Sequence, residues 1–286
     1  MNRGHRHFGF GRPRRPRVFK LLGALLLVAA GLPVAAVAAE PQPPLARAQR
    51  RWVDSTLAAM SLEQKASQLV MVRVYGHYES PTSEAYSRLL AEVRELEVGG
   101  LVLFSSELET VPRLLDDLQS VAPVPLLVAA DLERSLAFRI ERGTVPLPFA
   151  MAVGATGSEK AARFTGEVTA REGRALGIHW ALAPVADVNN NPANPVINIR
   201  SYGEDPELVA RLTAAYIRGA RAGGILTTAK HFPGHGDTDI DSHRDLPVLG
   251  ADRSRLAAVE LVPFRRAVEA GVDSIMLGHI AVPAID

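Results

Sequence analysis

Short apolar runs alternate with longer amphipathic segments along most of the chain. Six runs end in glycine, proline or polar residues and are typical of strands: residues 68–72, 100–104, 124–130, 179–188, 224–229 and 273–277. Between them, apolar side chains recur at helical spacing in residues 83–96, 158–176, 206–222 and 254–270. Asp205 and Pro206 supply an N-cap and a first helical residue for the third of these helices. Regular alternation of strand and helix predicts a parallel sheet.

Polar side chains follow the predicted strands at their carboxyl ends. Asp131 comes after the third strand, Asp187 after the fourth, Lys230 and His231 after the fifth, and His279 after the sixth. A (β/α)8 barrel carries its active site at this end of the strands. We therefore predict an α/β fold of the (β/α)8 TIM-barrel type with about six of its eight units. The Rossmann glycine fingerprint and the P-loop are both missing from the sequence.

The richest cluster of chemical groups follows the fifth strand. Residues 230–247 read KHFPGHGDTDIDSHRDLP and contain one lysine, three histidines and four aspartates. Such a concentration at the exit of a buried strand predicts an active site. Lys230 follows an apolar run, so we expect it to be partly buried, with a carboxylate or ligand hydroxyls as its partners.

This stretch resembles the strand-end motif of family 3 glycoside hydrolases. The triplet Asp241-Ser242-His243 resembles their single-domain β-N-acetylhexosaminidase branch in particular. Similar signatures occur at residues 131–139, 187–206 and 276–279, so the resemblance covers nearly all of residues 55–286. It implies the N-terminal (β/α)8 domain of that family. In the family the nucleophilic aspartate lies on the seventh strand, so the resemblance implies a truncated chain that is inactive alone.

The resemblance also implies roles for individual residues. In this branch a histidine oriented by an aspartate is the general acid/base, which matches His243 and Asp241. The implied reaction is retaining hydrolysis that removes terminal N-acetylglucosamine from β-linked glycans or cell-wall fragments. An imidazole with an ordinary pKa of about 6.5 can donate and retrieve a proton near neutral pH. Taken alone, an Asp-x-His pair is more often a turn or cap.

Five further residues match the family's substrate-binding positions. They are Asp131, Arg139, Arg200, Lys230 and His231. The family pattern around the first two is Asp-x-Glu-Gly-Gly-x-x-x-Arg. Arg134 and Ser135 replace its two glycines, and glycine permits backbone angles that other residues rarely adopt. The resemblance therefore does not extend to the shape of this loop, although Asp131, Glu133 and Arg139 keep the family's spacing.

Three other functions stay open on the sequence. A related phosphorylase would use the same His and Asp but transfer the sugar to phosphate. A metal-dependent barrel hydrolase would use nearby aspartates together with His231, His235, His243 and His279, although residues 68–74 lack its usual His-x-His pair. A calcium loop is excluded because Ser242 and Val248 occupy the sixth and twelfth positions. A non-catalytic sugar-binding protein would keep only the substrate-binding residues. We predict neither a metal nor a cofactor.

The first 39 residues have the composition of an export leader. Residues 1–20 contain seven basic residues and no acidic ones. They precede an apolar stretch at residues 21–39, which ends in small residues. We therefore predict a signal peptide at residues 1–39, with a membrane anchor as the alternative, and a hydrolase domain at residues 40–286. The protein would be periplasmic or secreted, and membrane-bound only if the leader is uncleaved.

Charge and cysteine content narrow the partners. Taking seven from the 32 Lys and Arg residues leaves 25 against 31 acidic residues, a net charge of −6 for residues 40–286. A nucleic-acid partner has no electrostatic support, and we expect a carbohydrate instead. The chain has no cysteine, which excludes disulfides and thiolate metal sites.

Overall fold

The computed structural model describes residues 45–140 and 142–285. The predicted leader, residues 1–39, lies outside the described residues. Within them, no helix has the length and apolar character that crossing a membrane requires.

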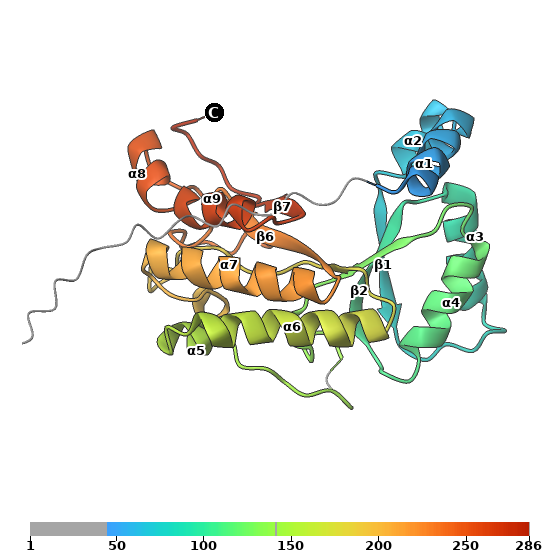
Figure 1. The fold of residues 1–286 in the computed structure, drawn as a ribbon, viewed down its shortest axis with the longest axis horizontal. Helices are drawn as coiled ribbons and strands as arrows, with labels where there is room; N and C mark the ends of the chain where they lie inside the picture. The colour runs from blue at the N-terminus through green and yellow to red at the C-terminus, as the bar shows by residue number, and fades with distance from the viewer. Residues whose placement is uncertain (1–44, 141, 286) are drawn as a thin grey trace, which may run out of the picture. The chain divides into compact units, whose positions relative to one another are not determined.

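Helices and strands alternate along the chain, as Figure 1 shows. Two helices precede the sheet, and its first half then contains three strands, a short additional strand and four helices. These elements are α1 (Arg47–Ala59), α2 (Leu62–Ser67), β1 (Met71–Gly76), α3 (Glu84–Leu96), β2 (Gly100–Ser106), α4 (Val111–Val121), β3 (Leu127–Ala130), β4 (Glu133–Leu136), α5 (Ala150–Ala155) and α6 (Glu159–Ala175). The second half continues with β5 (Trp180–Ala181), the 3-10 helix η1 (Asn198–Arg200), α7 (Pro206–Ala222), β6 (Leu226–Phe232), α8 (Arg253–Ala258), α9 (Leu261–Glu269) and β7 (Ser274–Leu277).

Six strands form one sheet in the order β1-β2-β3-β5-β6-β7, and every neighbouring pair is parallel. Because the spatial order equals the chain order, each strand returns to the same side of its predecessor through a helix, as in a (β/α)8 barrel. Among the described residues β1 and β7 are the edges, and the sheet is not closed. The predicted fold class and the number of units are therefore confirmed.

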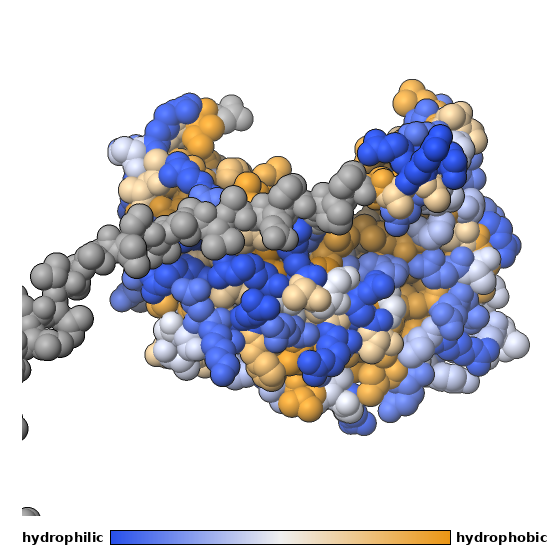
Figure 2. All heavy atoms as spheres, in the orientation of Figure 1, coloured by the Kyte–Doolittle hydropathy of each residue, from blue (hydrophilic) through white to orange (hydrophobic). Residues whose placement is uncertain are grey.

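Strand side chains divide between two faces because successive residues point in opposite directions. On β1 and β2, Val74, Leu101 and Leu103 are buried in the main core, which they share with residues of α3, α4, α6 and α7. Arg73 and Tyr75, which alternate with Val74, are exposed. The apolar core thus lies between the sheet and its helices. Figure 2 shows hydrophilic residues interspersed with hydrophobic ones over the outer face of α6 and α7.

Several predicted boundaries were wrong, each for a local reason. The first strand begins at Met71 rather than at residue 68, because Gln68 still bonds to Gln64 at the end of α2. The predicted strand 179–188 is reduced to β5, since Pro184 lacks an N–H and interrupts the ladder, and pairing resumes only as an isolated bridge between Val185 and Lys230. The predicted helix 254–270 is divided at Val259, whose backbone leaves the helical region.

The fifth predicted strand is longer than expected. It continues through Lys230 and His231 to Phe232, so both residues lie within β6 rather than after it. In contrast, α7 begins at Pro206 with Asp205 as N-cap, and the Asp205 side chain accepts a hydrogen bond from the Glu207 amide, as the sequence predicted. Trp180 is half-buried, and its indole N–H donates to the Thr228 hydroxyl.

Candidate active site

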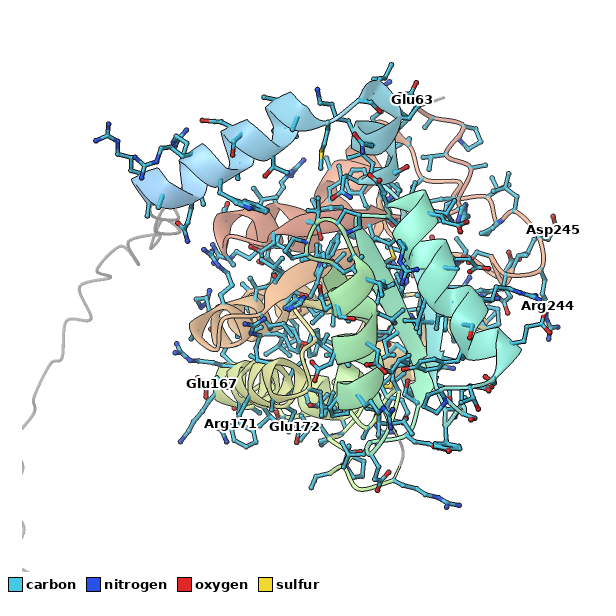
Figure 3. The ribbon with its side chains drawn as sticks, turned by 90° about the vertical axis from the view of Figure 1, so that its right-hand side faces the viewer. Glu63, Glu167, Arg171, Glu172, Arg244 and Asp245 are labelled. Carbon is cyan, nitrogen blue, oxygen red and sulfur yellow. The ribbon has the colours of Figure 1, made fainter. Side chains whose placement is uncertain are left out.

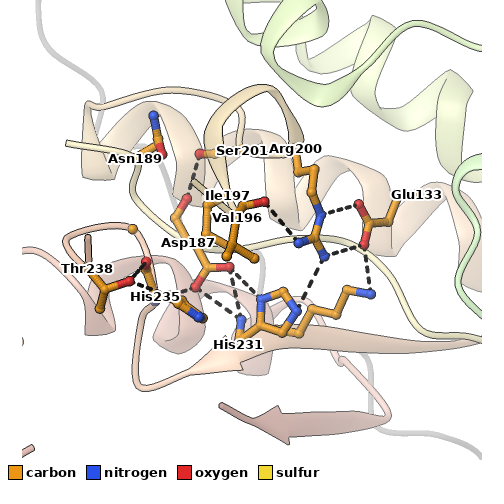
Figure 4. Close-up of polar contacts among 12 residues, drawn as sticks. Glu133, Asp187, Asn189, Val196, Ile197, Arg200, Ser201, His231, His235 and Thr238 are labelled. Carbon is orange, nitrogen blue, oxygen red and sulfur yellow. Dashed lines mark hydrogen bonds and ion pairs between the residues drawn. The ribbon is translucent and has the colours of Figure 1, made fainter. Parts of the chain in front are cut away.

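The carboxyl ends of the strands bring five predicted residues together. Asp131 directly follows β3, Arg139 lies on the segment after β4, and Arg200 ends η1. Lys230 and His231 come from β6. Figure 4 shows Arg200 between Glu133 and His231. The five residues that the resemblance assigns to substrate binding therefore lie close together, and their role stays a prediction.

Lys230 forms the centre of the cluster. Its side chain is 2 % exposed, and its Nζ lies 2.7 Å from Asp131 Oδ1 and 2.9 Å from Glu133 Oε1. Arg139 pairs with the other oxygen of Asp131. Arg200 donates two hydrogen bonds to the Glu133 carboxylate, at 2.8 and 2.9 Å. Three cations thus surround two carboxylates, and both carboxylates stay ionised.

The pKa values of the two carboxyl groups reflect the opposing effects of burial and of the neighbouring cations. Burial opposes the ionisation of Asp131, but Lys230 and Arg139 outweigh burial and lower its pKa. Burial also opposes the ionisation of Glu133, and there Lys230 and Arg200 lower the pKa to about 2. A cluster with fixed charges and oriented N–H groups suits a ligand rich in hydroxyls. The buried Nε of Arg139 has no hydrogen-bond partner among the described residues.

Asp187 and His231 form a second unit beside this cluster. The fully buried Asp187 carboxylate lies 2.8 Å from His231 Nδ1 and also accepts hydrogen bonds from the amides of His231 and His235. Burial opposes its ionisation, and these contacts outweigh that effect and lower its pKa. Arg200 Nη2 lies 3.5 Å from His231 Nε2. Because arginine can only donate, we assign the ring proton to Nδ1 and leave Nε2 as an acceptor.

Asp241 and His243 form a pair of their own on the loop after β6. His243 Nδ1 lies 2.7 Å from Asp241 Oδ1, and the same oxygen accepts a hydrogen bond from the His243 amide. These two contacts lower the pKa of Asp241. The His243 side chain is 78 % exposed, and it contacts none of the cluster residues among the described part of the chain. Figure 3 shows the next two residues, Arg244 and Asp245, at the outer edge of the view.

The described residues contain no group of three His, Cys, Asp or Glu side chains that could hold a metal ion. The histidines of residues 231–243 turn to separate partners: His231 to Asp187, His235 to Thr238 and His243 to Asp241. With their Nδ1 atoms engaged in this way, the three rings do not converge on a common point.

Two residues of the site escaped prediction from the sequence. Glu133 lies at the family's spacing but was not assigned a role, and it is the carboxylate that joins Lys230 to Arg200. Asp187 was noted only as a polar residue after a strand, and it organises the His231 and His235 backbone. The signal for Glu133 was available, because a buried lysine near two arginines needs more than one carboxylate.

The loop that departs from the family pattern keeps a glycine-like backbone. Ser135 is buried and has φ of +59°, in the left-handed region that glycine adopts without strain. Its hydroxyl donates to the Glu172 carboxylate. A serine thus holds the left-handed conformation with the help of one hydrogen bond.

A pair of substitutions at Ser135 separates the effect of the lost hydroxyl from the effect of the left-handed backbone. Ser135→Ala and Ser135→Gly both remove the hydroxyl, but only glycine relieves the left-handed backbone. We therefore expect the glycine variant to be more stable than the alanine variant by about 1 kcal/mol in denaturant unfolding. Equal unfolding free energies for the two variants would contradict the strained backbone at Ser135.

Comparison with known proteins agrees with this geometry. Residues 61–286 match the glycosyl hydrolase family 3 N terminal domain. The chain is 37 % identical over 238 residues to a β-N-acetylglucosaminidase/β-glucosidase of Cellulomonas fimi, covering 82 % of this chain and 40 % of that protein. It superposes on a family 3 β-N-acetylglucosaminidase from Paenibacillus with a TM-score of 0.74 and 42 % identity, covering 80 % of this chain and 44 % of that one.

A third relative catalyses a different transfer. A β-glucoside phosphorylase bound to 2FGlc superposes with a TM-score of 0.77 and 32 % identity, covering 84 % of this chain and 42 % of that one. The chain thus spans less than half the length of each of these three relatives. Sequence match, strand order and superposition agree, and the chain belongs to glycosyl hydrolase family 3, within the N-terminal domain of that family.

Proposed function

We propose that this chain is the sugar-binding and acid/base part of a retaining β-N-acetylglucosaminidase. The observation that carries the proposal is the ion-paired cluster of Asp131, Glu133 and Lys230 at the strand ends, with an Asp241–His243 pair on the adjoining loop. The names of two relatives support the substrate class: a β-N-acetylglucosaminidase/β-glucosidase from Cellulomonas and a β-N-acetylglucosaminidase from Paenibacillus. The substrate would carry terminal N-acetylglucosamine in β linkage, as in cell-wall fragments.

The cluster would hold the terminal sugar through its hydroxyls. Lys230 and Arg139 can donate N–H hydrogen bonds to a sugar hydroxyl oxygen, and the Asp131 carboxylate can accept one from its O–H. One site can thus satisfy a hydroxyl both as acceptor and as donor. His231 would present Nε2 as an acceptor in the tautomer that Asp187 fixes. Because these groups are already oriented by ion pairs, little side-chain entropy is lost when a sugar binds.

His243 would supply the proton chemistry. Its Nδ1 proton points to Asp241, which leaves Nε2 to carry the proton that is exchanged. In the first step Nε2 protonates the glycosidic oxygen while a carboxylate nucleophile attacks the anomeric carbon and the leaving group departs. In the second step Nε2 accepts a proton from water as that water displaces the carboxylate. We propose that the nucleophile comes from a part of the protein outside the described residues, because Asp131, Glu133 and Asp187 are held by cations or by His231.

The exposure of His243 implies that its loop moves during the reaction. An acid/base residue must come within hydrogen-bond reach of the leaving oxygen, although such contacts are often open in ligand-free structures. We therefore propose that the loop closes over a bound sugar and brings His243 to the cluster.

Phosphorolysis is the second candidate, favoured by the superposition on the β-glucoside phosphorylase. Both reactions share the first step and differ in whether water or phosphate attacks in the second.

Product analysis separates the two reactions. We expect the intact protein to release free N-acetylglucosamine from an aryl N-acetylglucosaminide at the same rate in phosphate and in a sulfonate buffer. NMR of the products gives the ratio of free sugar to sugar 1-phosphate. Accumulation of the sugar 1-phosphate, together with slow turnover without phosphate, would overturn hydrolysis. Prior dialysis against a chelator should leave the rate unchanged, and a loss restored by zinc would favour a metal-dependent hydrolase.

A further inference from the structure

A buried carboxylate lies beneath the loop that carries the Asp241–His243 pair. Glu260 is 3 % exposed and precedes the first residue of α9, but its side chain does not cap that helix. It packs so closely on the loop that a Cβ placed on Gly234 would lie 2.9 Å from the Cβ of Glu260. Burial raises the pKa of Glu260. Capping of α9 therefore does not explain why this carboxylate is buried here.

One arginine joins Glu260 to the loop. Arg255 on α8 places Nη2 3.2 Å from Glu260 Oε1, and the same Nη2 donates to Asp237 Oδ2 at 3.0 Å. Neither oxygen of Glu260 accepts a hydrogen bond from the described residues, so the attraction to Arg255 is that of two charges. Because Glu260 is nearly inaccessible while Arg255 is half-exposed, the buried charge fixes the position of the guanidinium.

The loop is held firmly up to Thr238 and then becomes exposed. Asn194 donates to the carbonyl of His235 at 2.7 Å, and the buried Thr238 lies 2.6 Å from His235 Nδ1. The loop is attached again where the Leu249 amide donates to Ala281. Between these two attachments lies the segment with Asp241 and His243. Asp237 is thus the last charged contact before the acid/base pair, four residues ahead of Asp241.

We propose that Glu260 and Arg255 are positioning residues that hold Asp237, and through it set the point from which the acid/base segment reaches the substrate. This inference rests on the proposed function. Neither residue lies in the Asp131–Lys230 cluster, so neither is a catalytic residue. A displacement of about 1 Å in an acid/base group can lower a rate by up to 10²-fold, which gives the anchor a measurable effect on turnover.

The chain offers a matched control on the same helix. Arg253 lies two residues before Arg255, is exposed, and pairs with no carboxylate among the described residues. Arg255→Met and Arg253→Met each remove one positive charge from α8. They differ in that only Arg255→Met breaks the contacts with Glu260 and Asp237, which we call the anchor. Glu260→Met removes the buried charge at similar volume and leaves the half-exposed Arg255 with its second partner, Asp237.

Hydrogen exchange of the intact protein without substrate is the first measurement. We expect Arg255→Met and Glu260→Met to accelerate exchange in residues 236–246 by about tenfold, while β1 to β3 exchange as in the wild type. Asp237→Asn should act likewise, and Asp237→Glu should restore part of the protection. Exchange as slow as in Arg253→Met, or acceleration throughout the protein, would overturn the anchor.

Kinetics with aryl N-acetylglucosaminides are the second measurement. For poorly activated leaving groups we expect Arg255→Met to lower kcat by about tenfold with KM nearly unchanged, and activated leaving groups to suffer less. The double variant with Asp237→Asn should be no slower than Arg255→Met, because both changes break one contact. Faster exchange with an unchanged kcat would overturn the positioning role. A wild type without glycosidase activity would refute the proposed function. The exchange experiment would still test whether Glu260 and Arg255 hold the loop through Asp237.

Discussion

His243→Ala is expected to lower kcat of the intact protein on poorly activated aryl N-acetylglucosaminides by roughly 10²-fold or more. This is the usual contribution of general acid/base catalysis. Among the described residues only Asp241 orients the imidazole, and its exposure leaves no packing role that could explain such a loss. Leaving groups of low pKa need little protonation, so their rates should fall less. Steady-state kinetics across a series of leaving groups measure the effect as a change in slope.

The control for this experiment is another exposed histidine. His77 is half-exposed and lies 3.8 Å from Glu107, away from the Asp241 loop in the sequence. His77→Ala should leave kcat and its dependence on the leaving group unchanged. If His243→Ala behaved in the same way, His243 would have no part in proton transfer, and the acid/base residue would have to be sought elsewhere.

The sequence predicted the parts of the fold that depend on repeated patterns. Alternating apolar runs identify all six sheet strands, because a parallel strand covered by helices needs a continuous apolar segment. The exact ends were harder to predict. Lys230 and His231 look like residues after a strand, yet they pair within β6 because their side chains find Asp131 and Asp187 as partners. A sequence pattern shows which residues are polar but not which tertiary contacts permit their burial.

The same distinction applies to the site. Residues at the strand ends could be grouped from the sequence because parallel strands end at one edge of the sheet. Which of these residues pair with one another could not be predicted, because pairing depends on distances between segments far apart in the chain. Glu133 and Arg200 are 67 residues apart and form the two-bond contact. The family resemblance implied that Asp241 orients His243, and the two side chains are in contact, but it could not show that the pair lies exposed and apart from the cluster.

Lys230→Met is expected to cause the largest loss of stability of any change in the cluster. It removes the cation that lies between two buried carboxylates, leaving Arg139 for Asp131 and Arg200 for Glu133. Loss of one partner from a buried ion pair typically costs about 3–5 kcal/mol. The exposed Lys160, changed to Met, serves as the control and should shift the free energy of unfolding by less than about 0.5 kcal/mol. Urea unfolding at pH 7 measures both.

The pH dependence of this loss distinguishes an electrostatic cause from a packing defect. In the wild type the lowered pKa of Glu133, about 2 against an ordinary value of 4.5, contributes stability that is present above pH 4.5 and lost as the pH falls toward 2. Without Lys230 the pKa values of Asp131 and Glu133 rise toward their ordinary values, so less stability remains to be lost on acidification. The destabilisation by Lys230→Met should therefore be greatest near neutral pH and shrink between pH 5 and pH 2. A destabilisation that stays constant over this range would show that Lys230 acts through packing and that the two carboxylates do not depend on its charge.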